Sequence, residues 1–89
     1  MIEVLFFKAP WCSACGGVLP HISAVCKDLS VKMETVDVST FDGETTGMRY
    51  NICSLPTVVV LSNGEMIGRI DSGVTRQGVI DLIKQAKDD

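Results

Sequence analysis

The spacing of apolar and polar positions changes along this chain, and the changes predict its elements. Residues 2–7 are apolar apart from Glu3, a pattern typical of a strand buried in the centre of a sheet. Between residues 13 and 29, apolar positions recur three and four apart, which predicts an amphipathic helix. Residues 31–38 alternate between apolar and polar, so they predict a second strand.

A hairpin is predicted in the second half of the chain. Residues 57–61 (Thr-Val-Val-Val-Leu) are β-branched and apolar, which favours a buried strand, and residues 66–70 return as its partner. The turn between them contains Asn63-Gly64, a pair that tolerates the positive φ of tight hairpin turns. Residues 41–50 are polar and contain glycine, so they favour at most a weak helix.

A final helix is predicted over residues 75–87, with Thr75 as a candidate N-cap. The predicted order is therefore β-α-β-α-β-β-α. A βαβ start pairs its strands in parallel through a right-handed crossover, whereas the hairpin pairs its strands antiparallel. We expect an α/β fold with a four-stranded mixed sheet and helices on both faces, built as a single domain over residues 1–89.

The composition of the chain argues against several classes of protein. The chain is 46% hydrophobic and 21% charged, which is apolar enough to fill a core and excludes a disordered linker. A net charge of −3 without a basic run argues against nucleic acid as a partner. No apolar run approaches the ~20 residues of a membrane helix. Met1 is followed at once by an apolar run, without a basic leader, so we expect a cytoplasmic protein.

Cys12 and Cys15, with two residues between them, lie at the predicted junction between the first strand and the first helix. A helix N-terminus carries roughly half a positive charge and unpaired N–H groups, which favour a thiolate over a thiol. Helix positions three apart hold their Cβ atoms about 5–6 Å apart, whereas a disulfide needs about 3.5–4.5 Å. We therefore expect Cys12 at or before the N-cap, exposed and nucleophilic, and Cys15 in the first turn, shielded and resolving.

The segment around these cysteines resembles the active-site segment of the thioredoxin family. Residues 6–15 are Phe-Phe-Lys-Ala-Pro-Trp-Cys-Ser-Ala-Cys, an apolar strand leading into Ala-Pro-Trp-Cys-x-x-Cys. Further matches to the family are Pro20, Val36-Asp37-Val38, Leu55-Pro56-Thr57, Asn63-Gly64-Glu65 and Gly73. The resemblance covers essentially all 89 residues, without the additional N-terminal strand and helix of longer thioredoxins.

The resemblance implies a thioredoxin-like fold and a protein-disulfide oxidoreductase. Its Cys12–Cys15 pair would be the only redox group, without another cofactor or a metal. Trp11 would offer a flat apolar surface beside Cys12. Pro56 would be cis and hold Leu55 opposite Cys12, where its backbone could pair with a substrate strand. The expected partners are a flavoprotein thioredoxin reductase or glutathione as electron source and disulfide-bearing client proteins, and the protein would be a monomer.

Three features of the sequence depart from the family pattern. Phe6 occupies the place of a buried Asp that helps to move the proton of the resolving thiol, and Glu3, Lys8 or water remain as substitutes. Ser13-Ala14 replaces the usual Gly-Pro, which is expected to shift the reduction potential. Gly16-Gly17 costs up to ~1 kcal/mol per glycine relative to alanine within a helix.

The other polar and thiol side chains have simpler interpretations. Cys26 lies on the apolar stripe of the first helix and is expected to be a small buried side chain. Cys53 precedes Pro56 by three residues and is either a passive loop thiol or a regulatory thiol. His21 is expected to be solvated, and Asp37 to be structural.

Other functions use the same chemistry or the same residue types, and the sequence argues against each of them. A glutaredoxin-like protein fed by glutathione uses the same chemistry, but Pro10-Trp11 precedes the pair here, and residues 67–73 lack the paired glycines that hold glutathione. A disulfide-forming oxidant or isomerase fits a cytoplasmic setting poorly. A structural zinc site needs four ligands, usually as two close pairs, whereas this chain has one close pair. A redox-inert binding domain would not need both cysteines.

Overall fold

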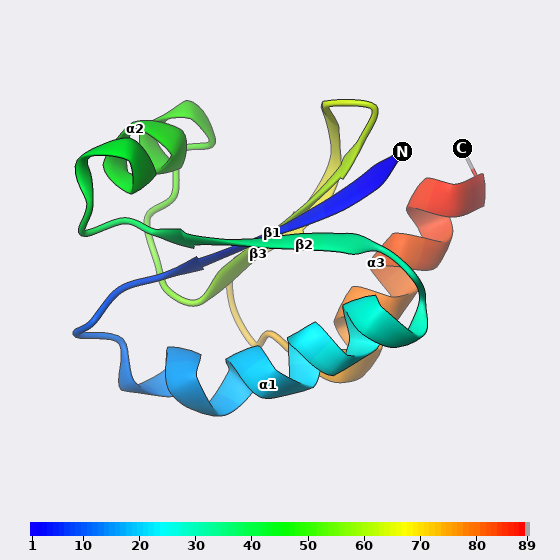
Figure 1. The fold of residues 1–89 in the computed structure, drawn as a ribbon, viewed down its shortest axis with the longest axis horizontal. Helices are drawn as coiled ribbons and strands as arrows, with labels where there is room; N and C mark the ends of the chain where they lie inside the picture. Colours follow the sequence, from blue (N-terminus) through cyan, green and yellow to red (C-terminus); the bar gives the residue numbers. More distant parts are fainter. Residues whose placement is uncertain (89) are drawn as a thin grey trace.

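The computed structural model describes residues 1–88, which form a four-stranded sheet covered by helices (Figure 1). The elements in chain order are β1 (Ile2–Lys8), α1 (Ser13–Asp28), β2 (Lys32–Asp37), α2 (Phe41–Arg49), β3 (Thr57–Ser62), β4 (Glu65–Ile70) and α3 (Arg76–Asp88). The predicted order of elements is confirmed. Most element ends differ from the predicted ones by one residue, and the others coincide with them.

The strands are ordered β2-β1-β3-β4, so β1 is central, as its apolar run predicts. β1 pairs with β2 in parallel and with β3 antiparallel, and β3 pairs with β4 antiparallel. The hairpin turn has positive φ at both Asn63 (54°) and Gly64 (86°), which confirms the predicted turn. At the other end of the sheet, Phe7 lies opposite Thr57, so β1 ends where β3 begins.

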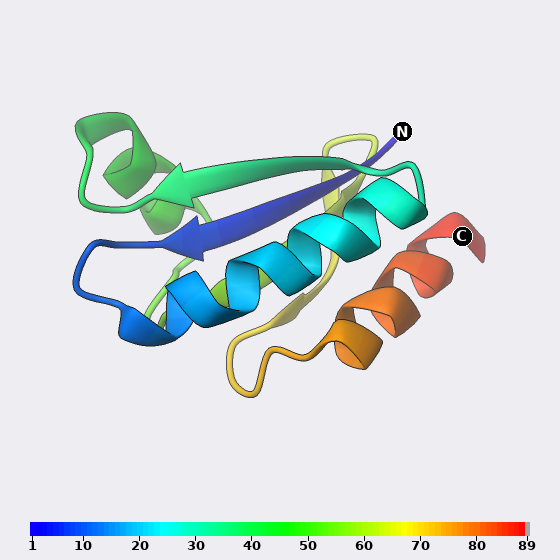
Figure 2. The same ribbon diagram turned by 60° about the horizontal axis from the view of Figure 1, so that its bottom comes forward.

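Helices cover both faces of the sheet (Figures 1 and 2). α1 and α3 pack on the face to which β1 directs Val4 and Phe6, both fully buried. α2 lies over the other face, where Leu5 and Phe7 are buried. The alternation along β1 thus divides one strand between two apolar clusters, which explains why its run is almost uninterrupted.

α2 is a regular helix rather than the weak one that its polar, glycine-bearing sequence predicts. Thr40 is its N-cap, and its hydroxyl accepts a hydrogen bond from the Gly43 amide over 3.0 Å. Gly43 is buried against the end of β2, where an added Cβ would overlap the carbonyl oxygen of Asp37. The glycine that weakens the helical pattern is therefore the residue that lets α2 approach the sheet.

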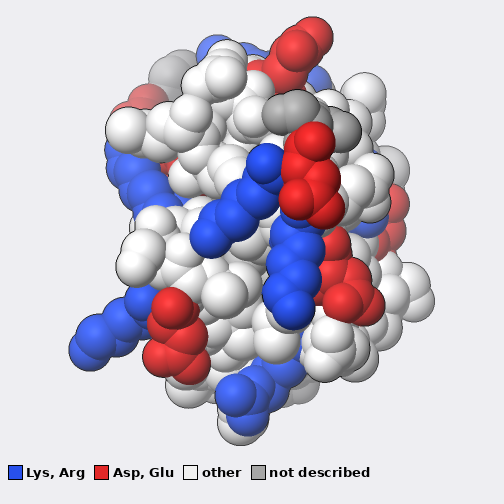
Figure 3. Space-filling model, turned by 90° about the vertical axis from the view of Figure 1, so that its right-hand side faces the viewer, with Lys and Arg blue, Asp and Glu red and all other residues white. Residues whose placement is uncertain are grey.

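Charges are mixed on the surface around the termini. On the face that Figure 3 shows, basic and acidic side chains lie beside one another rather than in areas of one sign. Among the described residues, none of the helices has the length and apolar character required to cross a bilayer.

Candidate active site

The turn between β1 and α1 brings the two cysteines together. The Cys12 amide donates to the Ala9 carbonyl over 3.0 Å, which closes the turn after β1. Cys12 is the N-cap of α1 with an extended backbone (φ −95°, ψ 93°), and Cys15 lies in the first helical turn. Both positions were predicted. The extended N-cap lets Cys12 bend toward Cys15, and a disulfide joins them with their Cα atoms 5.4 Å apart.

The two sulfurs differ in access to solvent. Cys15 is buried, with 3% of its surface exposed, and belongs to the apolar cluster beneath α1. Cys12 is half-buried and packs against the edge of the same cluster. Cys12 is thus the more accessible of the pair, as predicted, although it is half-buried rather than exposed.

No charge within the first turn of α1 opposes the helix dipole. The turn contains no acidic residue, and the N-cap makes no side-chain hydrogen bond to the free amides. The Cys15 amide donates to the Cys12 carbonyl over 3.2 Å, and the positive end of the helix dipole remains available to a negative charge on the Cys12 sulfur. When the disulfide is reduced, this environment stabilises the thiolate, which is the reactive form of cysteine.

A groove beside the disulfide, here called the Trp11 groove, has a volume of about 520 Å³. It is lined by Trp11, Val38, Glu44, Gly47, Met48, Asn51, Ile52, Cys53 and Leu55. Trp11 is 71% exposed, so its side chain is not part of the hydrophobic core. A hollow of about 580 Å³ lies at the opposite end of the sheet, and its lining contains no cysteine.

Leu55 and Pro56 lie at the same end of the sheet as Cys12. Their peptide bond is cis, as predicted. Because Phe7 pairs with Thr57, the turn formed by Leu55 and Pro56 lies beside the end of β1, where the chain leads into Cys12. Leu55 also packs against the apolar cluster that contains Cys15. The structure therefore brings Trp11, Leu55, Pro56 and the cysteine pair to one region.

Phe6 is fully buried on the α1 face of the sheet, where the family pattern places an Asp. Glu3 lies on the opposite face by the alternation of β1 and pairs with Lys32 over 3.7 Å, so it does not replace that carboxylate. Lys8 shares the face of Phe6 and is half-buried at the strand end. Of the two side chains considered as substitutes, only Lys8 is directed to the side of Cys15.

Asp37 has a structural environment at the end of β2. Its carboxylate accepts hydrogen bonds from the hydroxyl (2.6 Å) and the amide (2.9 Å) of Ser39. These hydrogen bonds, helped by the charge of Lys8, lower the pKa of Asp37. The predicted structural role of Asp37 agrees with this arrangement.

The remaining thiols and the histidine lie outside the disulfide. Cys26 is buried with 2% exposure, as predicted, and burial raises the pKa of its thiol. Cys53 is exposed in the Trp11 groove, and its Sγ donates to the Asn51 carbonyl over 3.5 Å. His21 is exposed on α1. Among residues 1–88, no three His, Cys, Asp or Glu side chains cluster as metal ligands.

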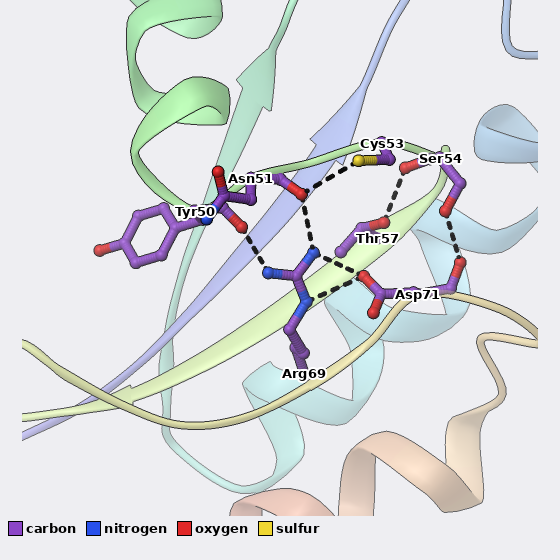
Figure 4. A network of polar contacts seen from close by, with 7 residues as sticks. All are labelled: Tyr50, Asn51, Cys53, Ser54, Thr57, Arg69 and Asp71. Carbon is purple, nitrogen blue, oxygen red and sulfur yellow. Dashed lines mark hydrogen bonds and ion pairs between the residues drawn. The ribbon is translucent and has the colours of Figure 1, made fainter.

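A polar network next to the groove could not be recognised in the sequence. Arg69 of β4 binds the end of α2 and the carboxylate of Asp71, and Ser54 binds the Asp71 carbonyl (Figure 4). The only sequence signal is that Arg69 is charged whereas the rest of the predicted strand 66–70 is not, and Arg69 stands 18 residues from its partner Asn51. Such a signal does not distinguish a solvated edge from a buried contact.

The fold and the site define a class of protein: a four-stranded α/β domain with a Cys-x-x-Cys disulfide at the start of its first helix and a cis-proline turn beside it. The sequence model of the thioredoxin family matches residues 2–85. Chloroplastic thioredoxin M4 of Arabidopsis thaliana is 34% identical over 71 residues, which are 80% of this chain and 37% of that protein. This chain belongs to the thioredoxin family.

Solved structures agree with this assignment. Thioredoxin of Schistosoma mansoni, in its reduced form, is 32% identical, covers 94% of this chain and 77% of its own, and superposes with a TM-score of 0.82. Thioredoxin 1 of Thermosipho africanus, at 24% identity, shares the fold with a TM-score of 0.85 over 97% of this chain and 94% of its own. The chain spans 37% to 65% of the length of three relatives known by sequence.

Proposed function

We propose that this protein is a thiol–disulfide oxidoreductase that reduces disulfides in client proteins. The observation that carries the proposal is the disulfide between a half-buried Cys12 at a helix N-terminus and a buried Cys15. The helix end favours the thiolate on the accessible sulfur, and the buried sulfur is protected until a client has bound. Membership of the thioredoxin family supports the same activity and does not favour the glutaredoxin-like alternative.

The reaction uses only the two cysteines of this chain. In the reduced protein, the Cys12 thiolate attacks one sulfur of the client disulfide, and the other client sulfur leaves as a thiolate that takes up a proton. Cys15, once deprotonated, attacks the Cys12 sulfur of this mixed disulfide and releases the second client thiol. The client gains two electrons and two protons, and the Cys12–Cys15 disulfide is formed. No metal or organic cofactor enters these steps.

The Trp11 groove is the proposed docking site for the client. Trp11 and Leu55 offer exposed and half-buried apolar surface on the side of the disulfide. The backbone around Pro56 would pair with an extended client segment, as a short added strand. This arrangement would align a client sulfur with Cys12.

The electron source, assembly and location are also proposals. We assign reduction of the Cys12–Cys15 disulfide to a flavoprotein thioredoxin reductase, in keeping with the family, and we propose a monomer with one domain over residues 1–89. Cys26 and Cys53 are unpaired thiols, which persist in reducing compartments such as the cytoplasm. Relatives include a chloroplastic thioredoxin and one from Bacillus subtilis, so cell fractionation has to test the cytoplasmic location.

Two measurements test the proposed activity. The reduction potential of the Cys12–Cys15 couple, equilibrated against defined thiol–disulfide buffers, should lie near the value of about −270 mV that is typical of thioredoxin. A value of about −200 mV or higher would instead favour a glutathione-linked or oxidising role. In a turnover assay with a protein disulfide, Cys12→Ser should be inactive; unchanged turnover by this variant would end the proposal.

A further inference from the structure

The side chain of Arg69 joins three separate segments near the Trp11 groove (Figure 4). It extends from β4, and 23% of the side chain is exposed. Its guanidinium donates to the Tyr50 carbonyl and, over 3.4 Å, to the Asn51 carbonyl. It also holds the Asp71 carboxylate through Nε (2.9 Å) and Nη2 (2.7 Å). One planar group thus connects β4, the end of α2 and the segment after β4.

The carbonyls that Arg69 binds are those at the C-terminal end of α2. Tyr50 is the C-cap, and Asn51 has a left-handed backbone with φ 54°. Carbonyls at a helix end have no donor within the helix and carry the negative end of its dipole. A guanidinium suits this position, because it is always charged and presents several N–H groups in a fixed plane. Arg69 therefore fixes the point at which the chain leaves α2.

A second contact holds the same segment further along. The Ser54 hydroxyl donates to the Asp71 carbonyl over 2.8 Å, and the Thr57 hydroxyl donates to the Ser54 carbonyl over 2.7 Å. Asp71 thus binds Arg69 with its carboxylate and Ser54 with its carbonyl. Between these attachments lie Ile52 and Cys53, which line the Trp11 groove, and directly after them comes the cis-proline turn.

We propose that Arg69, together with Asp71, is a positioning residue that fixes residues 50–56 as one wall of the Trp11 groove and so determines how tightly a disulfide-bearing protein docks. The inference rests on the proposed function, which assigns this groove to the client. Among the described residues, none of the hydrogen bonds that Arg69 makes involves Cys12 or Cys15. Loss of Arg69 should therefore weaken docking of a large client and leave the chemistry of the Cys12–Cys15 pair unchanged.

The test compares a protein disulfide with a small one. The variants are Arg69→Ala, Arg69→Lys and Asp71→Asn, with Arg76→Ala as the matched control on an exposed arginine at the start of α3. For reduction of insulin, Arg69→Ala should raise KM about tenfold, equivalent to about 1.4 kcal/mol of binding, with kcat little changed. Reduction of the small disulfide dithiobis(nitrobenzoic acid), measured with Cys53→Ser added to every protein to remove the exposed thiol, should proceed at the rate of the protein that retains Arg69. Lysine, a point charge, should restore part of the affinity.

The possible results separate the inference from the function on which it rests. An unchanged KM for insulin in a folded Arg69→Ala variant would overturn the positioning role, and so would an equal loss of activity toward both disulfides. If Arg69→Ala does not fold, Asp71→Asn keeps the shape of the partner while removing its charge, and it must then raise KM for insulin alone. Wild-type protein that reduces neither disulfide would refute the proposed function itself.

Discussion

Thr57 lies opposite Phe7 in the pairing of β3 with β1, and its buried hydroxyl donates to the Ser54 carbonyl over 2.7 Å. The strand pairing aligns the cis-proline turn with the strand end that leads into Cys12. The hydroxyl attaches the start of this turn to the sheet. Because a buried polar group is stable only when it is hydrogen-bonded, the same contact both satisfies Thr57 and holds the turn.

Removing this hydroxyl should destabilise the protein. Thr57→Val keeps the side-chain volume but leaves the Ser54 carbonyl without its donor, so the free energy of unfolding should fall by about 1 kcal/mol. Thr45→Val is the matched control, since the Thr45 hydroxyl binds the Phe41 carbonyl over 3.1 Å on the exposed surface of α2. Urea denaturation of the oxidised proteins measures both changes. Equal effects of the two substitutions would show that the buried hydroxyl has no special role.

Replacing the resolving thiol should trap a client. In Cys15→Ser the Cys12 thiolate still attacks, but the second thiol is missing, so the mixed disulfide with the client persists. Mass spectrometry under non-reducing conditions should show the client attached at Cys12. In Cys12→Ser the Cys15 thiol is buried, so little adduct should form there, and both variants carry Cys53→Ser to remove the exposed thiol. More adduct with Cys12→Ser than with Cys15→Ser would reverse the assigned roles.

The same substitution at two glycines should have opposite effects on stability. Gly17 lies within α1 with no neighbouring atom inside 4 Å of an added Cβ, so Gly17→Ala should raise the free energy of unfolding by up to ~1 kcal/mol through helix propensity. At Gly43 the added Cβ would overlap the Asp37 carbonyl, so Gly43→Ala should lower it by about 1–3 kcal/mol. Thermal unfolding of the two variants provides the comparison. A stabilising effect of Gly43→Ala would mean that α2 readily moves away from β2.

These two glycines illustrate what local sequence predicts and what it does not. The strands, α1 and α3 follow from periodicity, because their apolar faces are set by the pleat and the helical turn. The glycines of α2 look like breaks in a helix when only propensity is considered, yet Gly43 allows close packing against a strand that ends at Asp37. The spacing of apolar residues within one segment does not predict how closely that segment packs against another.

Some parts of the candidate site also follow from local sequence, and others do not. The positions of Cys12 and Cys15 follow from local geometry at a helix N-terminus, and the cis bond before Pro56 follows from the family resemblance. The contact of Arg69 with the end of α2 depends on a register between β3 and β4 and on where α2 ends, and neither was available from local spacing. A network formed by residues far apart in the chain can therefore be recognised only in the structure.

Cys26 should make stability depend on alkaline pH. Burial raises the pKa of its thiol above the ordinary value of 9.0, so the folded protein retains this proton at a pH at which the unfolded chain releases it. Where the unfolded state binds fewer protons, the free energy of unfolding falls as pH rises. The contribution of Cys26 is thus complete below about pH 9 and is lost progressively as the pH rises toward and through the raised pKa.

The measurement compares Cys26 with Cys26→Ala, both in a Cys53→Ser background that removes the other unpaired thiol of the oxidised protein. Urea denaturation at neutral and at alkaline pH gives the free energy of unfolding of each. Alanine leaves a small cavity whose cost does not depend on pH, so the difference between the two proteins isolates the titration. The stability advantage of Cys26 should shrink as the pH rises above its ordinary pKa. A difference that stays constant across this range would mean that the thiol ionises as readily in the core as in the unfolded chain.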